Sequence, residues 1–413
     1  MRLSIWIFFH FLSYFHVTLS APQQYTSIFN FGDSLSDTGN LLIILNATVV
    51  PSGSLPYGMT FFGGPTGRFS DGRLIIDFIA DAFGLPFLPP FVARGRHFRQ
   101  GANFAVSGAT ALDIEFFQQR RLGNLAGVNE SLSVQLRWFE GMKPSLCNST
   151  KSCRDYFSKS LFMIGELGVN DYITPLRARR SLKEVRSYVP KVVEKISMAT
   201  ERLIELGAAD LMVAGIPPMG CFPVCLTLLM SPNKEDYEPG TGCLKEVNNL
   251  TRYHNRLLRR SLDQLRIKYP RLRLTYADYY GAAIRLASNP KRYGFSNGAL
   301  RACCGGGGPY NFNSTVFCGQ PGSTVCKDPS TYVSWDSIHL TEAAYHSMAM
   351  GLLQGPYADP PWCGHQCQVS NHSSRSSLRG SASSASSASL ILFWVDFMLF
   401  YLMPIGLVCI LSF

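Results

Sequence analysis

Short apolar runs alternate with long amphipathic segments along most of this chain. The first run, 25–31, is rich in aromatic and β-branched residues and stops at a Gly-Asp-Ser turn. Three later runs, 160–165, 210–216 and 272–276, are bounded by Gly, Pro or charged residues. Such runs are typical of strands that are covered on both faces in a parallel sheet. The alternation therefore predicts an α/β fold: a three-layer α/β/α sandwich with a mostly parallel sheet.

The segments between these runs have the spacing of amphipathic helices. Valine and isoleucine recur at helical spacing in 182–206, and 244–269 has the same character. A further helix is expected over 341–353. Because strand and helix alternate without an internal repeat, we expect one enlarged domain over 21–366 rather than two domains.

Residues 1–20 have the features of a secretory signal. One cation, Arg2, precedes an apolar run, and small residues lead up to Ala21. An uncleaved membrane anchor is the alternative, but the run is short for a membrane span and contains polar residues. We therefore expect a cleaved signal and a secreted, extracellular protein.

The composition changes sharply after Pro361. Residues 367–389 form a Ser/Ala-rich low-complexity linker, and residues 390–413 form an apolar segment that Asp396 and Pro404 interrupt. Small residues, a polar spacer and a terminal apolar run resemble a lipid-anchor attachment signal. A membrane tail anchor and a non-native extension remain as alternatives. Contact with a membrane is expected only if this segment is an anchor.

The chain has twelve cysteines, which suits an oxidising compartment. Spacing does not settle their pairing, but three pairs are candidates for small disulfide loops: Cys147/Cys153, Cys221/Cys225 and Cys318/Cys326. Zinc is the competing use of cysteine, yet no C-x-x-C is present. We therefore expect no bound metal. Six N-x-S/T sequons are compatible with a glycoprotein: Asn46, Asn129, Asn148, Asn249, Asn313 and Asn371.

The formal net charge of +10 does not indicate a nucleic-acid partner. The cations are scattered, and the densest cluster, 177–180, is short. The glycine-rich segments 63–67 and 305–308 lack the lysine and the strand-turn-helix context of a phosphate-binding loop. We expect a solvated basic surface and no nucleic acid.

Three residues have the character of a catalytic triad. Ser34 follows the first run directly, so its hydroxyl should lie at the carboxyl edge of the sheet, with a helix beginning beneath it; a helix-capping serine is the alternative. His339 lies in a loop before an expected helix, three residues after Asp336, which can fold back to orient the imidazole. A capped turn with an ordinary loop histidine is the alternative here. The G-x-S-x-G elbow of α/β-hydrolases is missing around Ser34.

Five sequence blocks together resemble the plant GDSL-type esterase/lipases, a branch of the SGNH hydrolases, over about 25–363. The block F-G-D-S with D-T-G-N implies that Ser34 is the nucleophile, and D-S-I-H implies Asp336 and His339 as its partners. The block N-F-A-V-S-G-A implies that the Gly108 N–H lines the oxyanion hole. The G-x-N-D block implies the Asn170 side chain as the other donor. A G-R-F-S-D-G-R segment resembles the signature of the plant branch.

The resemblance implies a flavodoxin-like SGNH fold without a cofactor, and a secreted carboxylic ester hydrolase that forms an acyl-enzyme and, we expect, acts as a monomer. Its substrates would be lipid or small-molecule esters. The motifs L-P-Y-G and C-C-G look closest to a group that includes esterases of alkaloid and phenolic-choline esters, which favours small soluble esters. Val169 departs from the branch, which more often has a small residue there. An acyltransferase on the same scaffold and a non-catalytic binding protein are the alternatives.

Overall fold

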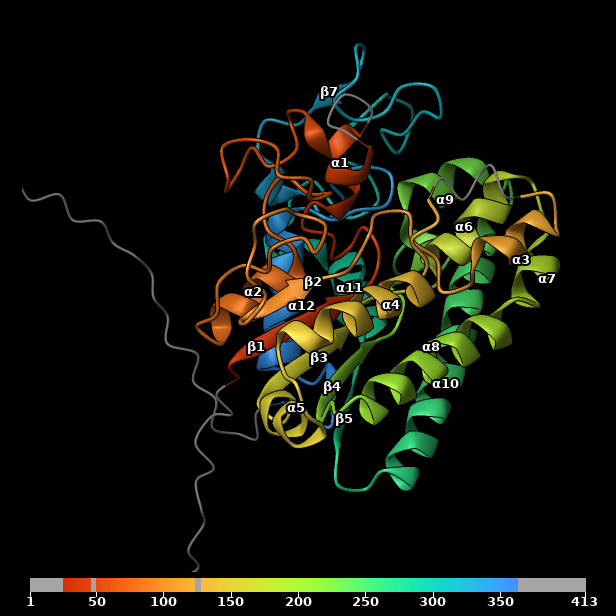
Figure 1. Ribbon diagram of the computed structural model, residues 1–413. Helices are drawn as coiled ribbons and strands as arrows, with labels where there is room; N and C mark the ends of the chain where they lie inside the picture. The colour runs from red at the N-terminus through yellow and green to blue at the C-terminus, as the bar shows by residue number, and fades with distance from the viewer. Residues whose placement is uncertain (1–24, 46–49, 123–127, 363–413) are drawn as a thin grey trace, which may run out of the picture. The chain divides into compact units, whose positions relative to one another are not determined.

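The computed structural model describes residues 25–45, 50–122 and 128–362 (Figure 1). The signal, the linker and the apolar C-terminal segment that the sequence predicts all lie outside these residues, as do the sequons at Asn46 and Asn371. Within the described ranges, no helix is long and apolar enough to cross a membrane.

A six-stranded sheet lies in the middle of the described residues. Its strand order is β2-β1-β3-β4-β5-β8, with bounds β1 (Ser27–Phe31), β2 (Gly101–Asn103), β3 (Ser160–Ile164), β4 (Asp210–Ala214), β5 (Arg273–Ala277) and β8 (Ala358–Asp359). The first five strands are parallel, and β8 joins the edge antiparallel to β5. The parallel order 2-1-3-4-5 is that of flavodoxin-like sheets, whose ligands bind at the carboxyl ends beside the first strand. The predicted α/β sandwich is confirmed.

The two faces of the sheet bury alternate residues of each strand, as strand geometry requires. One face packs against helices α4, α5, α8 and α10, and the other against α2, α11 and α12 (Figure 1). The first face carries Phe29, Phe31, Phe162, Ile164, Leu211, Val213, Leu274 and Tyr276, and the second carries Ile28, Leu161, Met163, Met212, Ala214 and Ala277. Both faces are therefore covered, which explains why the strand sequences are mainly apolar rather than strictly alternating.

The helices follow the predicted pattern with one division. The bounds are α1 (Asn40–Leu45), α2 (Ile75–Ala82), α3 (Ile114–Gln118), α4 (Leu132–Met142), α5 (Thr150–Phe157), α6 (Val169–Arg177), α7 (Leu182–Arg186), α8 (Val189–Glu205), α9 (Pro223–Leu228), α10 (Lys245–Lys268), α11 (Tyr279–Ser288) and α12 (Glu342–Leu353). The predicted helix 182–206 is two helices, because Pro190 lies in the first turn of α8 and has no N–H to continue the helix before it.

The disulfides correct two of the three candidate pairs. Cys147–Cys153 forms as expected. Cys221 pairs with Cys243 instead of Cys225. Cys225 lies inside α9, in the apolar core, as a buried free thiol. Close spacing in sequence thus does not bring Cys221 and Cys225 into bonding position, because the helix directs the second side chain into the core.

Cys318 and Cys326 also fail to pair with each other. They bond instead to the vicinal cysteines, Cys304 and Cys303 respectively. Cys304 lies in the short strand β6 (Cys304–Gly305), which pairs with β7 (Thr324–Val325). Successive side chains of an extended backbone point to opposite sides, so two adjacent cysteines reach two different partners.

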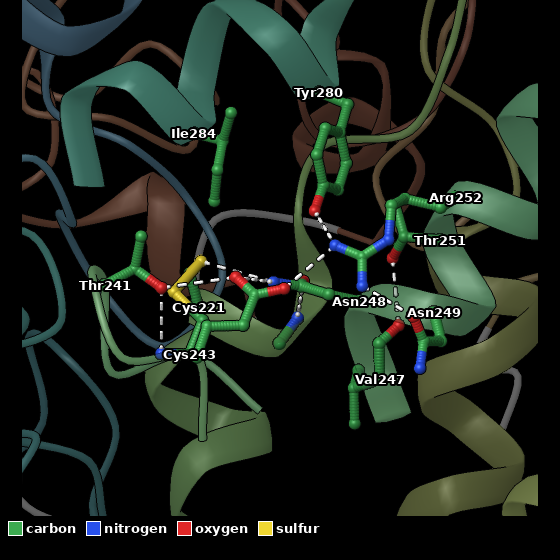
Figure 2. A network of polar contacts seen from close by, with 12 residues as sticks. Cys221, Thr241, Cys243, Val247, Asn248, Asn249, Thr251, Arg252, Tyr280 and Ile284 are labelled. Atoms are coloured by element: carbon green, nitrogen blue, oxygen red, sulfur yellow. Dashed lines mark hydrogen bonds and ion pairs between the residues drawn. A yellow bond between two sulfur atoms is a disulfide. The ribbon is translucent and has the colours of Figure 1, made fainter. Parts of the chain in front are cut away.

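A polar network surrounds the Cys221–Cys243 disulfide (Figure 2). Arg252 of α10 donates hydrogen bonds to the Glu238 carboxylate, at 2.8 Å, and to the Tyr280 hydroxyl of α11, at 2.7 Å. Asn248 of α10 also donates to Glu238, at 3.1 Å. The disulfide ties the loop before α10 to Cys221, and the network fastens the same loop to α10 and α11.

Candidate active site

Ser34 lies three residues beyond β1, beside the point where the strand order reverses. The helix that was expected directly beneath it is absent: turns follow, and α1 begins only at Asn40. The Asp37 carboxylate accepts the N–H groups of Gly39, Asn40 and Leu41 at 2.7, 2.6 and 3.1 Å, and thereby caps α1. Because Asp37 does the capping, the hydroxyl of Ser34 is available for another partner.

That partner is His339. Its Nε2 lies 2.7 Å from Ser34 Oγ, and its Nδ1 lies 2.8 Å from Asp336 Oδ2. Ser34, Asp336 and His339 are only 7%, 5% and 6% exposed. The three residues that the sequence proposed as a triad are thus joined in one continuous hydrogen-bonded chain, although 305 positions separate Ser34 from His339.

The backbone around Asp336 orients its carboxylate. Oδ1 accepts the N–H groups of Ile338 and His339 at 2.8 and 2.9 Å, as in an Asx turn. Burial alone would raise the pKa of Asp336, but the neighbouring imidazole and these donors lower it below the ordinary value of an aspartate. Asp336 is therefore an ionised acceptor, which suits a group that holds the Nδ1–H tautomer of His339.

Two aromatic residues that the sequence reading did not single out complete this side of the site. Tyr57, which is buried, donates a hydrogen bond from its hydroxyl to Asp336 Oδ2 at 2.9 Å. The ring of Phe69 packs on the imidazole of His339 with 4.7 Å between ring centroids. Tyr57 lies in the L-P-Y-G motif and Phe69 in the G-R-F-S-D-G-R segment, so the motifs marked the right segments without revealing these contacts.

The rest of the G-R-F-S-D-G-R segment fixes α12, the helix that follows His339. Asp71 accepts the N–H of Glu342 at 2.8 Å, and Arg73 forms an ion pair with the Glu342 carboxylate at 2.9 Å. Arg68 makes a buried two-pronged ion pair with Asp77 at 2.7 and 2.8 Å. This segment therefore positions the histidine loop from a distance of some 270 residues in sequence.

The two expected oxyanion-hole residues lie in segments that are hydrogen-bonded to the loop of the serine. Asn170, at the start of α6, donates from Nδ2 to Asp33 Oδ2 at 2.9 Å and to the carbonyl of Ala109 at 3.0 Å. Gly108 has φ +85°, a conformation that favours glycine. Across the described part of the chain, neither the Gly108 N–H nor the Ser34 N–H donates to a protein acceptor. Both N–H groups are thus free to bind a ligand.

Two buried aspartates hold the loop that carries Gly108. Asp37 Oδ2 accepts the N–H of Ser107 at 2.8 Å. Asp171 accepts the N–H groups of Ala111 and Leu112 at 2.9 and 3.0 Å. Burial raises the pKa of Asp171 to about 7, although these donors oppose the shift. The aspartates of the D-T-G-N and G-x-N-D blocks therefore shape the glycine loop, a role that their sequence position alone did not reveal.

The three remaining histidines of the described chain lie outside this chain of hydrogen bonds. His97 is exposed, and His346 packs edge-on against Phe78. His254 is buried in α10, where its Nδ1 lies 2.8 Å from the Tyr172 hydroxyl. Burial lowers the pKa of His254 to about 3, so it is neutral. No group of three or more His, Cys, Asp or Glu side chains in the described ranges is arranged to hold a metal ion.

In this site a serine is bonded to a histidine, which is bonded to an aspartate. This chain of hydrogen bonds lies at the carboxyl edge of a parallel sheet and beside backbone N–H groups that have no acceptor among the described residues. Such an arrangement is that of a serine hydrolase. Comparison with known proteins agrees. Residues 28–352 match the family model described as GDSL-like Lipase/Acylhydrolase. A GDSL esterase/lipase of Arabidopsis thaliana is 49% identical over 345 residues, which cover 82% of this chain and 93% of the relative.

Further relatives have the same character. Another GDSL esterase/lipase of Arabidopsis thaliana is 48% identical over 345 residues, covering 83% of this chain and 87% of the relative. Sinapine esterase of Brassica napus is 45% identical over 358 residues, covering 85% of this chain and 92% of the relative. The chain belongs to the plant GDSL esterase/lipases and is a serine ester hydrolase. The predicted family and enzyme class are both confirmed.

Proposed function

We propose that Ser34 is the nucleophile of this carboxylic ester hydrolase. His339 removes the proton from Ser34 Oγ as it attacks the ester carbonyl, and Asp336 holds the imidazole and stabilises its charged form. The same imidazole then protonates the leaving alcohol, and water cleaves the acyl-enzyme. The observation that carries this proposal is the unbroken chain of hydrogen bonds from Ser34 Oγ to Asp336, with 2.7 and 2.8 Å links.

The oxyanion is proposed to bind three N–H donors: the backbone N–H groups of Ser34 and Gly108, and Nδ2 of Asn170. In the free enzyme both Nδ2 protons are engaged, by Asp33 and by the Ala109 carbonyl. A charged oxygen is a stronger acceptor than a neutral carbonyl, so the developing oxyanion would replace Ala109 as the partner of one proton. Asp33 would keep the other proton and thereby hold the amide in place.

The substrate is proposed to be a small soluble ester rather than a triglyceride. Support comes from two observations: the L-P-Y-G and C-C-G motifs, and the 45% identity to a relative named for its action on sinapine. The L-P-Y-G motif supplies Tyr57, which contacts Asp336, so this motif lies against the catalytic residues. Which small ester is hydrolysed depends on loops such as 51–67 and 87–100.

The test is hydrolysis of p-nitrophenyl esters of increasing chain length by the protein and by its Ser34→Ala and Asn170→Ala variants. Ser34→Ala should abolish turnover, and Asn170→Ala should lower kcat about a hundredfold or more. Sinapine and a long-chain triglyceride assayed side by side decide the substrate class. Retained turnover in Ser34→Ala would refute the nucleophile, and transfer of the acyl group to an added alcohol in preference to water would indicate an acyltransferase.

Secretion after cleavage near Ala21 is also part of the proposal. The four disulfides of the described residues support it, because such bonds persist in oxidising compartments. N-terminal sequencing of the protein from culture medium tests it directly: the first residue should lie close to Ala21, and retention of the protein inside the cell would contradict export.

A further inference from the structure

A second carboxyl group lies directly behind the active-site serine, and the mechanism above does not use it. Glu166 follows β3, and its side chain is fully buried. It is in hydrogen-bond contact with the carboxyl group of Asp33, the residue before Ser34, which is also fully buried. Two buried carboxylates in contact cannot both be ionised without a large cost, so one proton is held between them.

The hydrogen bonds show which carboxyl group holds that proton. Both oxygens of Asp33 accept N–H groups at 2.9 Å, Oδ1 from Leu35 and Oδ2 from Asn170 Nδ2. Oε1 of Glu166 accepts the N–H of Val169 at 2.9 Å. Oε2 of Glu166 accepts no hydrogen bond from the described residues. The arrangement is satisfied when Glu166 Oε2 carries the proton and donates it to an ionised Asp33.

This pair connects to the oxyanion donor. Asp33 is one of only two acceptors that hold the Asn170 amide in the described structure, and it fixes Nδ2 rather than Oδ1 on the side of the serine. We propose that Glu166 is a positioning residue: as a neutral acid it donates a hydrogen bond to Asp33, which in turn holds Asn170 Nδ2 for the oxyanion. This inference rests on the oxyanion role of Asn170 proposed above.

The surroundings favour the neutral form of Glu166. Burial is the largest cause that raises its pKa well above the ordinary value, followed by the charge of Asp33 and, more weakly, that of Asp171. Burial is also the largest cause that raises the pKa of Asp33; His339 lowers this pKa, and Asp37 raises it. Tyr172 and Tyr279 are also close enough to Glu166 to interact with it electrostatically, although the Tyr172 hydroxyl is bonded to His254. A second negative charge here would also oppose the oxyanion that forms at Ser34, so the proton serves catalysis as well as stability.

The experiment compares two substitutions of similar size. Glu166→Gln keeps one acceptor for the Val169 N–H and one N–H donor for Asp33, and cannot ionise. Glu166→Met fills the same space but can neither donate to Asp33 nor accept from Val169. Each is made alone and together with Asn170→Ala, and kcat and KM are measured on a p-nitrophenyl ester after thermal melting has shown that the variants fold.

We expect Glu166→Gln to retain kcat within about threefold, and Glu166→Met to lose about tenfold or more with little change in KM, because only transition-state stabilisation is reduced. In the Asn170→Ala background, Glu166→Met should cause little further loss, since both changes remove the same interaction. A residue that only supports the fold would reduce kcat to a similar extent in both backgrounds.

Two results would overturn the inference. One is a Glu166→Gln variant as slow as Glu166→Met, because the amide provides the same donor as the neutral acid. The other is a full additional loss of kcat when Glu166→Met is combined with Asn170→Ala. If Glu166→Met does not fold, a loss of kcat of about tenfold or more in Glu166→Gln overturns the inference. Normal turnover in Asn170→Ala or Ser34→Ala would instead refute the proposed function, which separates the two failures.

Discussion

Replacing Tyr57 by phenylalanine removes one hydroxyl from the buried side of Asp336, the aspartate proposed to orient His339. The hydroxyl donates to Asp336 Oδ2 at 2.9 Å, and both residues are almost fully buried, so water cannot easily take its place. The phenyl ring retains the contacts of the tyrosine ring with Phe69 and Trp335, at 5.6 and 5.7 Å between centroids. The substitution therefore tests the hydrogen bond separately from the packing.

The size of the loss caused by Tyr57→Phe depends on the hydrogen bonds that Asp336 retains. A hydrogen bond to a charged group contributes about 1.5–3 kcal/mol. Asp336 keeps its contacts with the His339 ring and with two backbone N–H groups, so we take the lower end, about 1.5 kcal/mol. If this loss falls on the step in which His339 becomes charged, kcat should decrease about tenfold while KM changes little.

The assay is steady-state hydrolysis of a p-nitrophenyl ester, with Tyr280→Phe as the matched control. The Tyr280 hydroxyl contacts Arg252 in the network around the Cys221–Cys243 disulfide, so this control should leave kcat unchanged. Unchanged kcat in Tyr57→Phe would refute the role of the hydroxyl. A loss as large as that caused by Asp336→Ala would refute the reasoning that the remaining donors still hold the carboxylate.

Three further outcomes are expected. Arg68→Met should lower the free energy of unfolding by about 3–5 kcal/mol in urea titration, because it leaves the buried charge of Asp77 without its partner; a loss below about 1 kcal/mol would contradict that account. Peptide mapping of the oxidised protein should recover Cys221 joined to Cys243, and Cys221→Ser should cost about 3 kcal/mol; any other partner for Cys221 overturns the connectivity. The pKa of Glu166 is raised in the folded protein, so the wild type loses stability as the pH rises through that pKa. Glu166→Gln has no such proton to lose, and its melting temperature relative to wild type should therefore increase from pH 5 to pH 9. A difference in melting temperature that stays constant would argue against a buried proton.

Much of the sheet could be predicted because its strands are covered on both faces. Short runs rich in apolar residues, such as those that contain β1 and β3, have few alternatives in a chain of this composition. The strands β2 and β8 could not be predicted, since they have three and two residues and no recognisable pattern. Gly101 in β2 shows the reason: a Cβ there would lie 1.9 Å from the Ile28 carbonyl, and such close backbone packing leaves no hydrophobic signature.

The candidate site could be predicted where its residues lie in short motifs that are typical of a reaction. Ser34, Asp336 and His339 lie in motifs, and the structure brings them into contact. Tyr57 and Glu166 were missed, because a single tyrosine or glutamate in sequence does not show which buried group it meets. The disulfides were missed for a related reason: spacing along the chain limits which cysteines can pair, but the fold decides which ones meet.

The separation of Ser34 from His339, its proposed base, also has a consequence for biosynthesis. The proposed nucleophile, Ser34, lies near the start of the described domain and His339 close to its end, 305 positions later. A growing polypeptide therefore contains Ser34 long before the imidazole that is proposed to activate it has been synthesised. With Ser34 and His339 in the proposed roles, hydrolytic activity is expected only after the last helix has docked, so activity would report the completion of folding, and chains that end before His339 are expected to be inactive.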